Sequence, residues 1–267
     1  MLECVVNISE GRDIAFLAGL AERLSPWLLD VHTDRDHNRS VFTLVGEDAP
    51  RILARECVGR LALDSHEGVH PRIGVVDVVP FVPLAGSTMD DAVRARDSFA
   101  RWAGGELFLP AFVYGAERTL PDIRRSAWKD LGPDHGPHAP HPTAGAVCVG
   151  ARDVLVAYNV WLENADIATA KAIAARVRSP FVRTLGLQVG ALTQVSMNLV
   201  SPDLTTPMHA FDAVVSHARG TGARIAHAEL VGLVPGAVLS LVPEGRWEEL
   251  DLSPERTIES RLARLGN

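Results

Sequence analysis

The 267-residue chain has few of the residues that cross-link a protein or anchor it in a membrane. Its three cysteines, Cys4, Cys57 and Cys148, show no CxxC spacing, so no disulfide framework is indicated. No run of 18 apolar residues occurs, which excludes a spanning helix of the usual kind. The first twelve residues include Glu3 and do not resemble a secretion signal. We therefore expect a cytoplasmic protein with reduced thiols and no membrane partner.

The motifs of several large enzyme classes are missing as well. There is no GxGxxG and no GxxxxGK[ST], so the two common nucleotide-binding loops have no support. No GxSxG marks a serine nucleophile. Cys4 and Cys148 lie in apolar, strand-like runs where a buried thiol is usually inert.

The ten histidines raise the question of a metal. HxxxH occurs at His66 and His70, and HxxHxxH occurs within residues 135–141. Gly68 interrupts the first spacing and Pro71 follows it, so a helix that aligns the two rings is not expected. The second set lies among prolines. We expect no bound metal, with a zinc ion as the alternative.

Bulk charge restricts the partners. The net charge is −7, with 24 arginines but only two lysines among the basic residues. An acidic chain of this kind is not expected to bind nucleic acid, because phosphate binding needs a basic surface. Charge alone would favour a neutral or cationic ligand. The composition itself, 47% hydrophobic and 22% charged with a mean hydropathy of +0.09, is that of an ordinary globular protein.

Apolar periodicity predicts one order of elements twice along the chain. In the first half, strands are expected at 2–8, 27–31, 41–45 and 75–82, with helices at 14–24 and from 48 to 61. A helix at 89–102 and a strand at 107–114 extend this half. In the second half, strands are expected at 154–160, 184–190, 194–200 and 224–231, with helices at 167–177 and from 206 to 215, and a last helix follows residue 253.

Between the halves lies LGPDHGPHAPHPTAG, residues 131–145, which is rich in proline and predicts a loop. The fold class is therefore α/β (α+β), with two ferredoxin-like βαββαβ subdomains. We expect subdomains at 1–151 and 152–267, helices on one face of each sheet, and a cleft between the two halves that holds the ligand.

Chemistry-bearing residues gather where the predicted strands end. Residues 7–11 read NISEG, residues 30–39 read DVHTDRDHNR, and residues 66–78 read HEGVHPRIGVVDV. The loops of an antiparallel sheet can bring such segments together. Histidine titrates near neutrality, and neighbouring carboxylates and arginines shift its pKa, so these three segments suit acid–base chemistry.

Seven strings identify a family. They are ECVVNISEGR (3–12), DHNRSVFTLVG (36–46), HEGVHPRIGVVDVVPF (66–81), PDHGP (133–137), GARDVLVAYNVWL (150–162), QVSMNL (194–199) and ELVGLVP (229–235). In this order, over nearly the whole chain, they resemble the formiminotransferase domain of the glutamate formimidoyltransferase family. The two-subdomain architecture that the resemblance implies agrees with the repeated element order.

The resemblance implies transfer of a formimino group from N-formimino-L-glutamate to tetrahydrofolate, which serves as co-substrate, with release of glutamate. It implies that His70 in the GVHPR segment is the general acid/base. It also implies that the loop carrying Gly136, Pro137 and Gly145 contacts the folate, and that the protein is a homodimer.

The other expected contacts combine the resemblance with side-chain chemistry. Arg39, Arg72 and Arg152 are candidates for substrate carboxylates, because a guanidinium binds a carboxylate through two hydrogen bonds. The alternative for Arg39 and Arg72 is an internal salt bridge with Asp77 or Asp36.

Asn7 and Asn38 are candidates for polar groups of the pterin, or they cap turns. At His32 and Ala144 the chain departs from the family, which usually has an acid and an aromatic residue there. A formyl donor, another divergent transferase and a catalytically inactive binding module remain the alternatives.

Overall fold

The computed structural model describes residues 1–266, which divide into two compact units. Unit 1 runs from Met1 to Asp153 and unit 2 begins at Val154. The cleft expected between the two halves stays a prediction.

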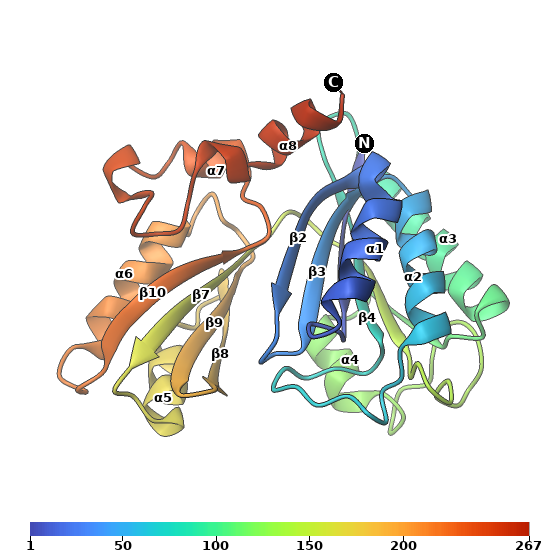
Figure 1. Cartoon of the computed structure of the whole chain (residues 1–267), viewed down its shortest axis with the longest axis horizontal. Coiled ribbons are helices and arrows are strands. Elements are labelled where there is room, and N and C mark those ends of the chain that lie inside the picture. Colours follow the sequence, from blue (N-terminus) through green and yellow to red (C-terminus); the bar gives the residue numbers. More distant parts are fainter. Residues whose placement is uncertain (267) are drawn as a thin grey trace. The chain divides into compact units, whose positions relative to one another are not determined.

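Unit 1 is built on a six-stranded sheet in the order β2-β3-β1-β4-β6-β5 (Figure 1). Its strands are β1 (Leu2–Ile8), β2 (Leu28–Asp34), β3 (Arg39–Val45), β4 (Val76–Pro83), β5 (Ala111–Tyr114) and β6 (Val147–Ala151). Its helices are α1 (Ile14–Leu24), α2 (Asp48–Arg60), α3 (Met89–Glu106) and α4 (Leu120–Ser126), with a 3-10 turn at Ser25–Trp27. The antiparallel part, β2-β3-β1-β4, is the predicted βαββαβ arrangement, and β6 and β5 extend it as parallel strands.

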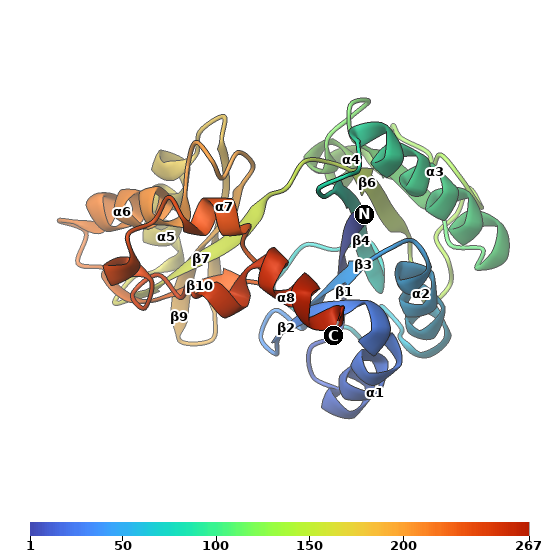
Figure 2. The same ribbon diagram turned by 90° about the horizontal axis from the view of Figure 1, so that it is seen from above.

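The core of unit 1 explains why these segments fold as they do. Alternate residues of β1, Cys4, Val6 and Ile8, are fully buried and pack against Leu17 and Leu20 of α1. Helix α3 begins with a capping box between Thr88 and Asp91. Helices α1, α2 and α3 cover one face of the sheet (Figures 1 and 2).

Three expectations about unit 1 need correction. Helix α4 was not predicted, and its Ile123 packs with Val78, Phe112 and Cys148 on the opposite face, so the helices do not all lie on one face. Its seven residues bury only Ile123, which leaves no periodic apolar pattern to read. Strand β6 was missing from the predicted order of elements, although the run around Cys148 was described as strand-like, since VCVGA is too short to separate from the preceding loop. Strand β5 begins at Ala111, later than expected, because Phe108 has a positive φ of 51° and Pro110 follows it.

The register brings the expected polar segments to one edge of the unit 1 sheet. Ile8 at the end of β1 pairs with Ser40 at the start of β3 and with Val76 at the start of β4. The starts of β5 and β6 lie at the same edge, because these strands are parallel to β4. The irregular segment 131–145 runs along this edge and bonds Ala111 through its own backbone at Asp134 and His135. The sheet therefore places the β2–β3 turn, the 63–75 loop and the 131–145 loop together.

Unit 2 repeats the ferredoxin-like pattern with a four-stranded antiparallel sheet in the order β10-β7-β9-β8. Its strands are β7 (Val156–Glu163), β8 (Val182–Val189), β9 (Leu192–Leu199) and β10 (Arg224–Val231). Helices α5 (Ile167–Val177) and α6 (Pro207–Ala218) pack on one face of that sheet (Figures 1 and 2). Short helices α7 (Gly236–Leu239) and α8 (Ile258–Leu265) follow β10, and α7 was not predicted. The mixed α/β class with two βαββαβ units is confirmed.

Within residues 1–266, no helix combines the length and the apolar character that crossing a membrane requires.

Candidate functional site

The site at the sheet edge of unit 1 is organised around one buried carboxylate. Asp77, the second residue of β4, has a fully buried side chain. Its Oδ2 lies 2.8 Å from Nη1 of Arg39 and 2.6 Å from Nη2 of Arg124, and its Oδ1 accepts from the backbone N–H of Ile73 at 2.9 Å. Burial opposes ionisation of Asp77, but the two guanidiniums outweigh it and hold the pKa of this carboxyl below its usual range. The three side chains together carry one net positive charge.

Arg39 is therefore engaged within the protein. Besides Asp77 it donates to Oδ1 of Asn7 from Nε at 3.2 Å and from Nη2 at 2.9 Å. The internal salt bridge with Asp77, which the sequence left open as an alternative for Arg39, is present. Asn7 in turn donates to the carbonyl of Val5.

The β2–β3 turn is fixed by Asn38. This residue has a positive φ of 47°, which asparagine tolerates better than most residues. Its Oδ1 accepts from the backbone N–H of Gly11 at 2.9 Å, and its Nδ2 donates to the carbonyl of Glu67 at 3.0 Å. One amide thus ties the end of β1, the turn and the 63–75 loop together, which is the turn-capping alternative for Asn38.

The turn and the 63–75 loop touch through Gly68. A Cβ on this residue would lie 2.3 Å from the His37 carbonyl oxygen and 3.0 Å from Cε1 of His66, so only glycine fits without movement. His66 seals the same contact by donating from Nε2 to the carbonyl of Asn38 at 2.8 Å. Close approach of backbones therefore sets where the next residues of the loop, His70 among them, lie.

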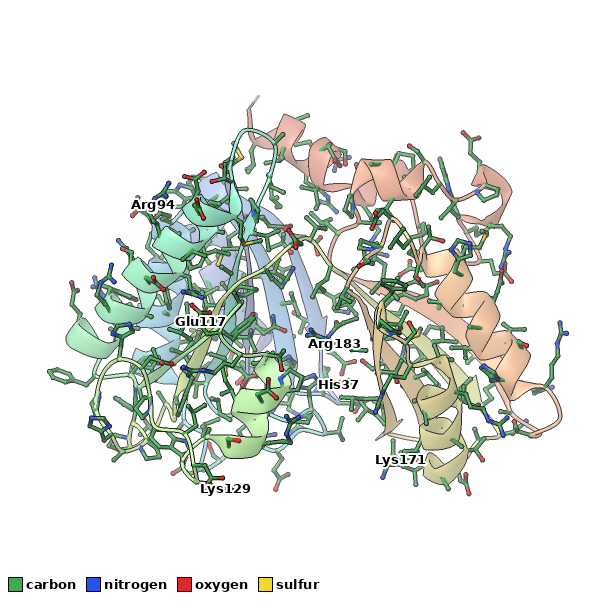
Figure 3. All side chains as sticks on the ribbon, turned by 180° about the vertical axis from the view of Figure 1, so that it is seen from behind. His37, Arg94, Glu117, Lys129, Lys171 and Arg183 are labelled. Carbon is green, nitrogen blue, oxygen red and sulfur yellow. The ribbon has the colours of Figure 1, made fainter. Side chains whose placement is uncertain are left out.

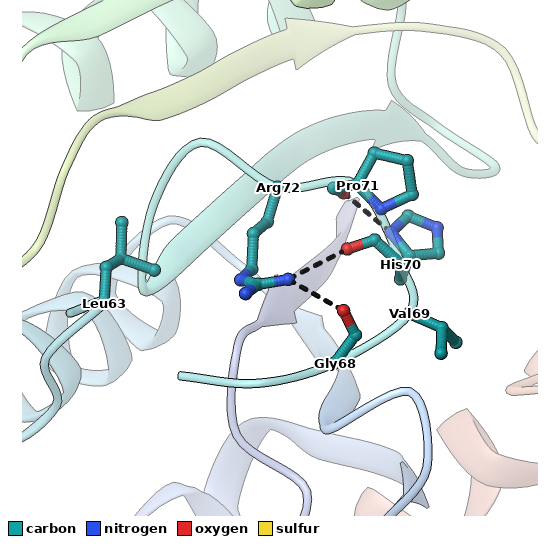
Figure 4. Close-up of a pocket in the computed structure, with 6 residues that line it drawn as sticks. All are labelled: Leu63, Gly68, Val69, His70, Pro71 and Arg72. Carbon is teal, nitrogen blue, oxygen red and sulfur yellow. Dashed lines mark hydrogen bonds between the residues drawn. The ribbon is translucent and has the colours of Figure 1, made fainter. Parts of the chain in front are cut away.

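His70 lines an open pocket of about 530 Å³, together with Leu63, Gly68, Val69, Pro71 and Arg72 (Figure 4). Arg72 donates from Nη1 to the carbonyls of Gly68 and His70 at 3.1 and 3.3 Å, and from Nη2 to the carbonyl of His66 at 2.7 Å. It thereby shapes the loop. Within residues 1–266 no carboxylate pairs with Arg72, so its positive charge at the pocket is not neutralised by an ion pair.

The protonation state of His70 follows from its contacts. Its Nδ1 lies 2.8 Å from the carbonyl oxygen of Pro71, and a carbonyl only accepts, so Nδ1 carries the hydrogen. Nε2 is left with the free electron pair. Burial, followed by the charge of Arg39, lowers the pKa of His70 to about 3. The ring is therefore neutral at pH 7, with Nε2 as a base.

A second histidine lies beside it. The ring centroid of His37 is 6.2 Å from that of His70, and the two planes meet at 49°. His37 is 8% exposed and comes from the β2–β3 turn at the edge of the sheet (Figure 3). Sequence reasoning marked its segment as rich in acids and histidines but did not single out this residue.

The remaining predicted residues are not all brought to His70. Gly145, with a φ of 72°, packs against the Ile73 carbonyl, where a Cβ would approach to 2.3 Å, so it lies next to the His70 loop. Gly136 packs instead against Gly104 of α3. Pro137 follows it, at the β5 side of the same edge. Arg152 donates to the carbonyl of Asp153, and His32 lies on β2 opposite Val41.

One member of the Asp77 cluster, Arg124, was not predicted from the sequence. Arg124 lies 47 residues from Asp77 on a helix with no readable pattern, so their ion pair could not be anticipated.

Unit 2 has a polar cluster of its own, in which Glu229 accepts from Asn159 at 2.9 Å and from Trp161 at 2.8 Å. Beside Trp161 on β9 is Gln194, whose fully buried amide has no hydrogen-bond partner among residues 1–266. The family-like strings at 150–162, 194–199 and 229–235 contain these residues, but the sequence did not predict their contacts.

Within residues 1–266 no three histidine, cysteine, aspartate or glutamate side chains form a group that could hold a metal ion. The histidines at 66 and 70 do not form a ligand pair, since His66 binds the Asn38 carbonyl and His70 binds that of Pro71.

Comparison with known proteins gives the family of the chain. Residues 1–152 match the model of the formiminotransferase domain, N-terminal subdomain, and residues 157–244 match that of the formiminotransferase domain. The chain is 34% identical to a glutamate formimidoyltransferase of Streptococcus pyogenes serotype M1, over 91% of this chain and 92% of that protein. It is 33% identical to a glutamate formimidoyltransferase of Thermoplasma acidophilum, over 90% and 89%.

A longer relative shows where such a chain also occurs. The formimidoyltransferase-cyclodeaminase of Sus scrofa is 32% identical over 88% of this chain but only 50% of its own length. The domain matches and these relatives define a transferase enzyme. The chain belongs to the formiminotransferase family, as its sequence predicted.

Proposed function

We propose that this enzyme transfers the formimino group of N-formimino-L-glutamate to N5 of tetrahydrofolate, giving 5-formiminotetrahydrofolate and glutamate. The observation that carries the proposal is the state of His70: a neutral ring with Nδ1 held by the Pro71 carbonyl and Nε2 available at an open pocket. The similarity to proteins named glutamate formimidoyltransferase supports the donor.

The reaction needs a proton to leave one nitrogen and another to arrive at a second. N5 attacks the amidine carbon, its proton passes to Nε2 of His70, and the tetrahedral adduct collapses when the glutamate nitrogen gains a proton. Histidine suits this exchange.

A base with a pKa of about 3 is weak, however. Burial is the largest cause of this low pKa and remains when substrates bind, but anionic substrates would raise the pKa of His70 in part, because their carboxylates oppose the Arg39 charge that also lowers it.

Arg72 is the residue proposed to attract a substrate carboxylate. Its three hydrogen bonds to carbonyls use three of five N–H groups, which leaves two donors and an unpaired charge at the pocket. Arg39, Asn7 and Asn38 are proposed to hold the site in place rather than to bind substrate directly. Along the 131–145 loop, the Gly145 end lies beside the His70 loop and is the part proposed to reach the folate, with Gly136 and Pro137 farther along the edge.

The test is a product assay with the full chain. N-formimino-L-glutamate is incubated with and without tetrahydrofolate, and glutamate and the folate product are separated by chromatography. We expect glutamate to appear only when tetrahydrofolate is present, in equal amount to the folate product. Release without folate would show a hydrolase and contradict the proposal. N-formylglutamate as donor tests the formyl alternative, and faster transfer from it would overturn the assigned donor.

Two further expectations accompany the proposal. The homodimer predicted from the family resemblance is tested by the molar mass in solution, measured by light scattering coupled to size-exclusion chromatography. Substitution of Arg72 by lysine keeps the charge but removes the planar fork. We expect the KM for formiminoglutamate to rise more than kcat falls, and unchanged KM would remove Arg72 from the binding site.

A further inference from the structure

His37 of the β2–β3 turn lies beside His70. We infer that His37 is a second proton-transfer residue of this site, which in its protonated form donates a proton to the leaving glutamate nitrogen. The inference rests on the proposed function. It divides the two proton transfers between two rings, with His70 as the acceptor and His37 as the donor.

The surroundings of His37 are unusual for a structural histidine. Only 8% of the residue is exposed, and among residues 1–266 its Nε2 is enclosed without a hydrogen-bond partner. A buried polar atom without a partner costs free energy, and such atoms are rare in folded proteins. His66 also has an unpartnered buried nitrogen, Nδ1, but its Nε2 donates to the Asn38 carbonyl, whereas His37 has the Asp34 carboxylate beside its free Nε2.

Asp34 is placed to orient the ring. Its Oδ1 accepts from the backbone N–H groups of Asp36 and His37 at 2.8 and 2.7 Å, which fixes the carboxylate within the turn. Its Oδ2 lies 4.0 Å from Nε2 of His37, so a small rotation of the ring makes a hydrogen bond. A carboxylate at Nε2 keeps a hydrogen there and leaves Nδ1 as the nitrogen that exchanges protons, which is the arrangement of a carboxylate-oriented histidine.

The distance between the rings fits two ends of one reacting group. In the substrate, N5 of the folate and the glutamate nitrogen flank a single carbon. Ring centroids 6.2 Å apart lie in the range of rings in contact, so the reacting N–C–N unit does not lie between the two rings, and the two rings reach its nitrogens from the same side. Gly68 and the Asn38 amide hold the two segments in this relation.

Other charged groups face the pair from each neighbouring element. Asp34 and Asp36 belong to the turn of His37, His66 and His70 belong to the facing loop, and Arg39 and Asp77 lie behind His70.

The two proton transfers balance over one turnover. The N5–C bond forms and the N5 proton passes to Nε2 of His70. Protonated His37 then gives its Nδ1 proton to the glutamate nitrogen, the C–N bond to glutamate breaks, and the formimino group stays on N5. His70 loses and His37 regains one proton through solvent before the next turnover.

The test compares His37→Gln with His217→Gln, a matched change of a histidine on α6 of unit 2. We expect His37→Gln to lower kcat by about 10²–10⁴-fold, the usual range for loss of general acid catalysis, with KM changed less than about threefold. In wild type, kcat should fall at high pH, where the donor has lost its proton, and this fall should be absent in His37→Gln. His217→Gln should behave as wild type.

Asp34→Asn gives an independent measurement, because its Oδ1 still accepts the two turn hydrogen bonds while the charge beside Nε2 is lost. Loss of the carboxylate charge disfavours the protonated ring, so the fall of kcat at high pH should move to lower pH. This variant decides the matter if His37→Gln does not fold. The inference is wrong if His37→Gln retains kcat near that of His217→Gln, or if activity is lost with an unchanged pH profile. If wild type releases no glutamate at all, the proposed function fails and this inference fails with it.

Discussion

Substitution of Asp77 by asparagine tests the organising role given to the buried carboxylate. The change keeps the shape and the Oδ1 acceptor for the Ile73 N–H, and removes only the charge. Arg39 and Arg124, whose side chains are 11% and 18% exposed, would then lie side by side without a counter-charge.

The expected loss of stability is large, although the substitution only replaces one carboxylate oxygen by an amide nitrogen. Breaking one partner of a buried ion pair costs about 3–5 kcal/mol, since the remaining charge stays desolvated. For a unit of this size, each kcal/mol lowers the melting temperature by about 2–4 °C, which gives a shift of roughly 6–20 °C. Melting would be followed by circular dichroism and by calorimetry, because a chain of two units need not unfold in one step.

The control is Glu106→Gln, which removes an ion pair with Arg55 whose side chains are 61% and 62% exposed. Surface pairs contribute about 0–1 kcal/mol, so this variant should melt within a few degrees of wild type. A double variant, Asp77→Asn with Arg124→Gln, should lose less than the sum of the two single losses, because the second change removes one uncompensated charge. If Asp77→Asn melts no lower than Glu106→Gln, the reasoning about this cluster is refuted.

Three further predictions follow from the same structure. Gly68→Ala forces the His37 and His70 segments apart and should lower kcat by about 10-fold or more, since misplacement of a catalytic group by about 1 Å can lower the rate about 10²-fold. The control is Gly59→Ala on α2, where a Cβ meets nothing within 4 Å, and this variant should stay fully active. Equal activity of the two variants would contradict the close contact at Gly68. The pKa of His70 is lowered from about 6.5 in the unfolded chain to about 3 in the folded protein. Between these two values the unfolded state binds more protons, so the free energy of unfolding decreases as the pH is lowered, by at most about 1.4 kcal/mol per pH unit. Urea denaturation between pH 7 and 4 should show a shallower decline for His70→Gln, and parallel curves would count against the assigned pKa. Cys4, Cys57 and Cys148 are fully buried, and burial raises the pKa of each thiol. A thiol reagent should therefore label none of the three in the native protein and all three after denaturation. Rapid labelling of the native protein would contradict their burial.

The repeated fold could be predicted because its signal is local. Buried alternation along β1 and the helical spacing of Leu17, Leu20 and Leu24 are properties of adjacent residues. Helix α4 and β6 escaped because each is short and is held by contacts from distant segments. The position of His70 in a strand-end loop was predictable, but its neutral state depends on Pro71, Arg39 and burial together.

The net charge of the chain also did not predict the charge of the site. A net charge of −7 favoured a cationic or neutral ligand, yet the site combines Arg39 and Arg124 with one carboxylate and leaves Arg72 without an ion pair among the described residues. Bulk charge governs solubility and long-range attraction, whereas a site is set by the few groups that line it. Tertiary contacts decide those groups, and spacing in the sequence does not reveal them.

The central claim is that His70 is the base of a tetrahydrofolate-dependent transfer, and kcat of His70→Gln tests it most directly. The variant is compared with wild type and with His217→Gln, a change of a histidine on α6 of unit 2, at saturating formiminoglutamate and tetrahydrofolate, after each has been shown to fold. We predict that wild type and His217→Gln release glutamate at similar rates while His70→Gln is slower by at least about 10²-fold. A His70→Gln variant that turns over at the wild-type rate would contradict it.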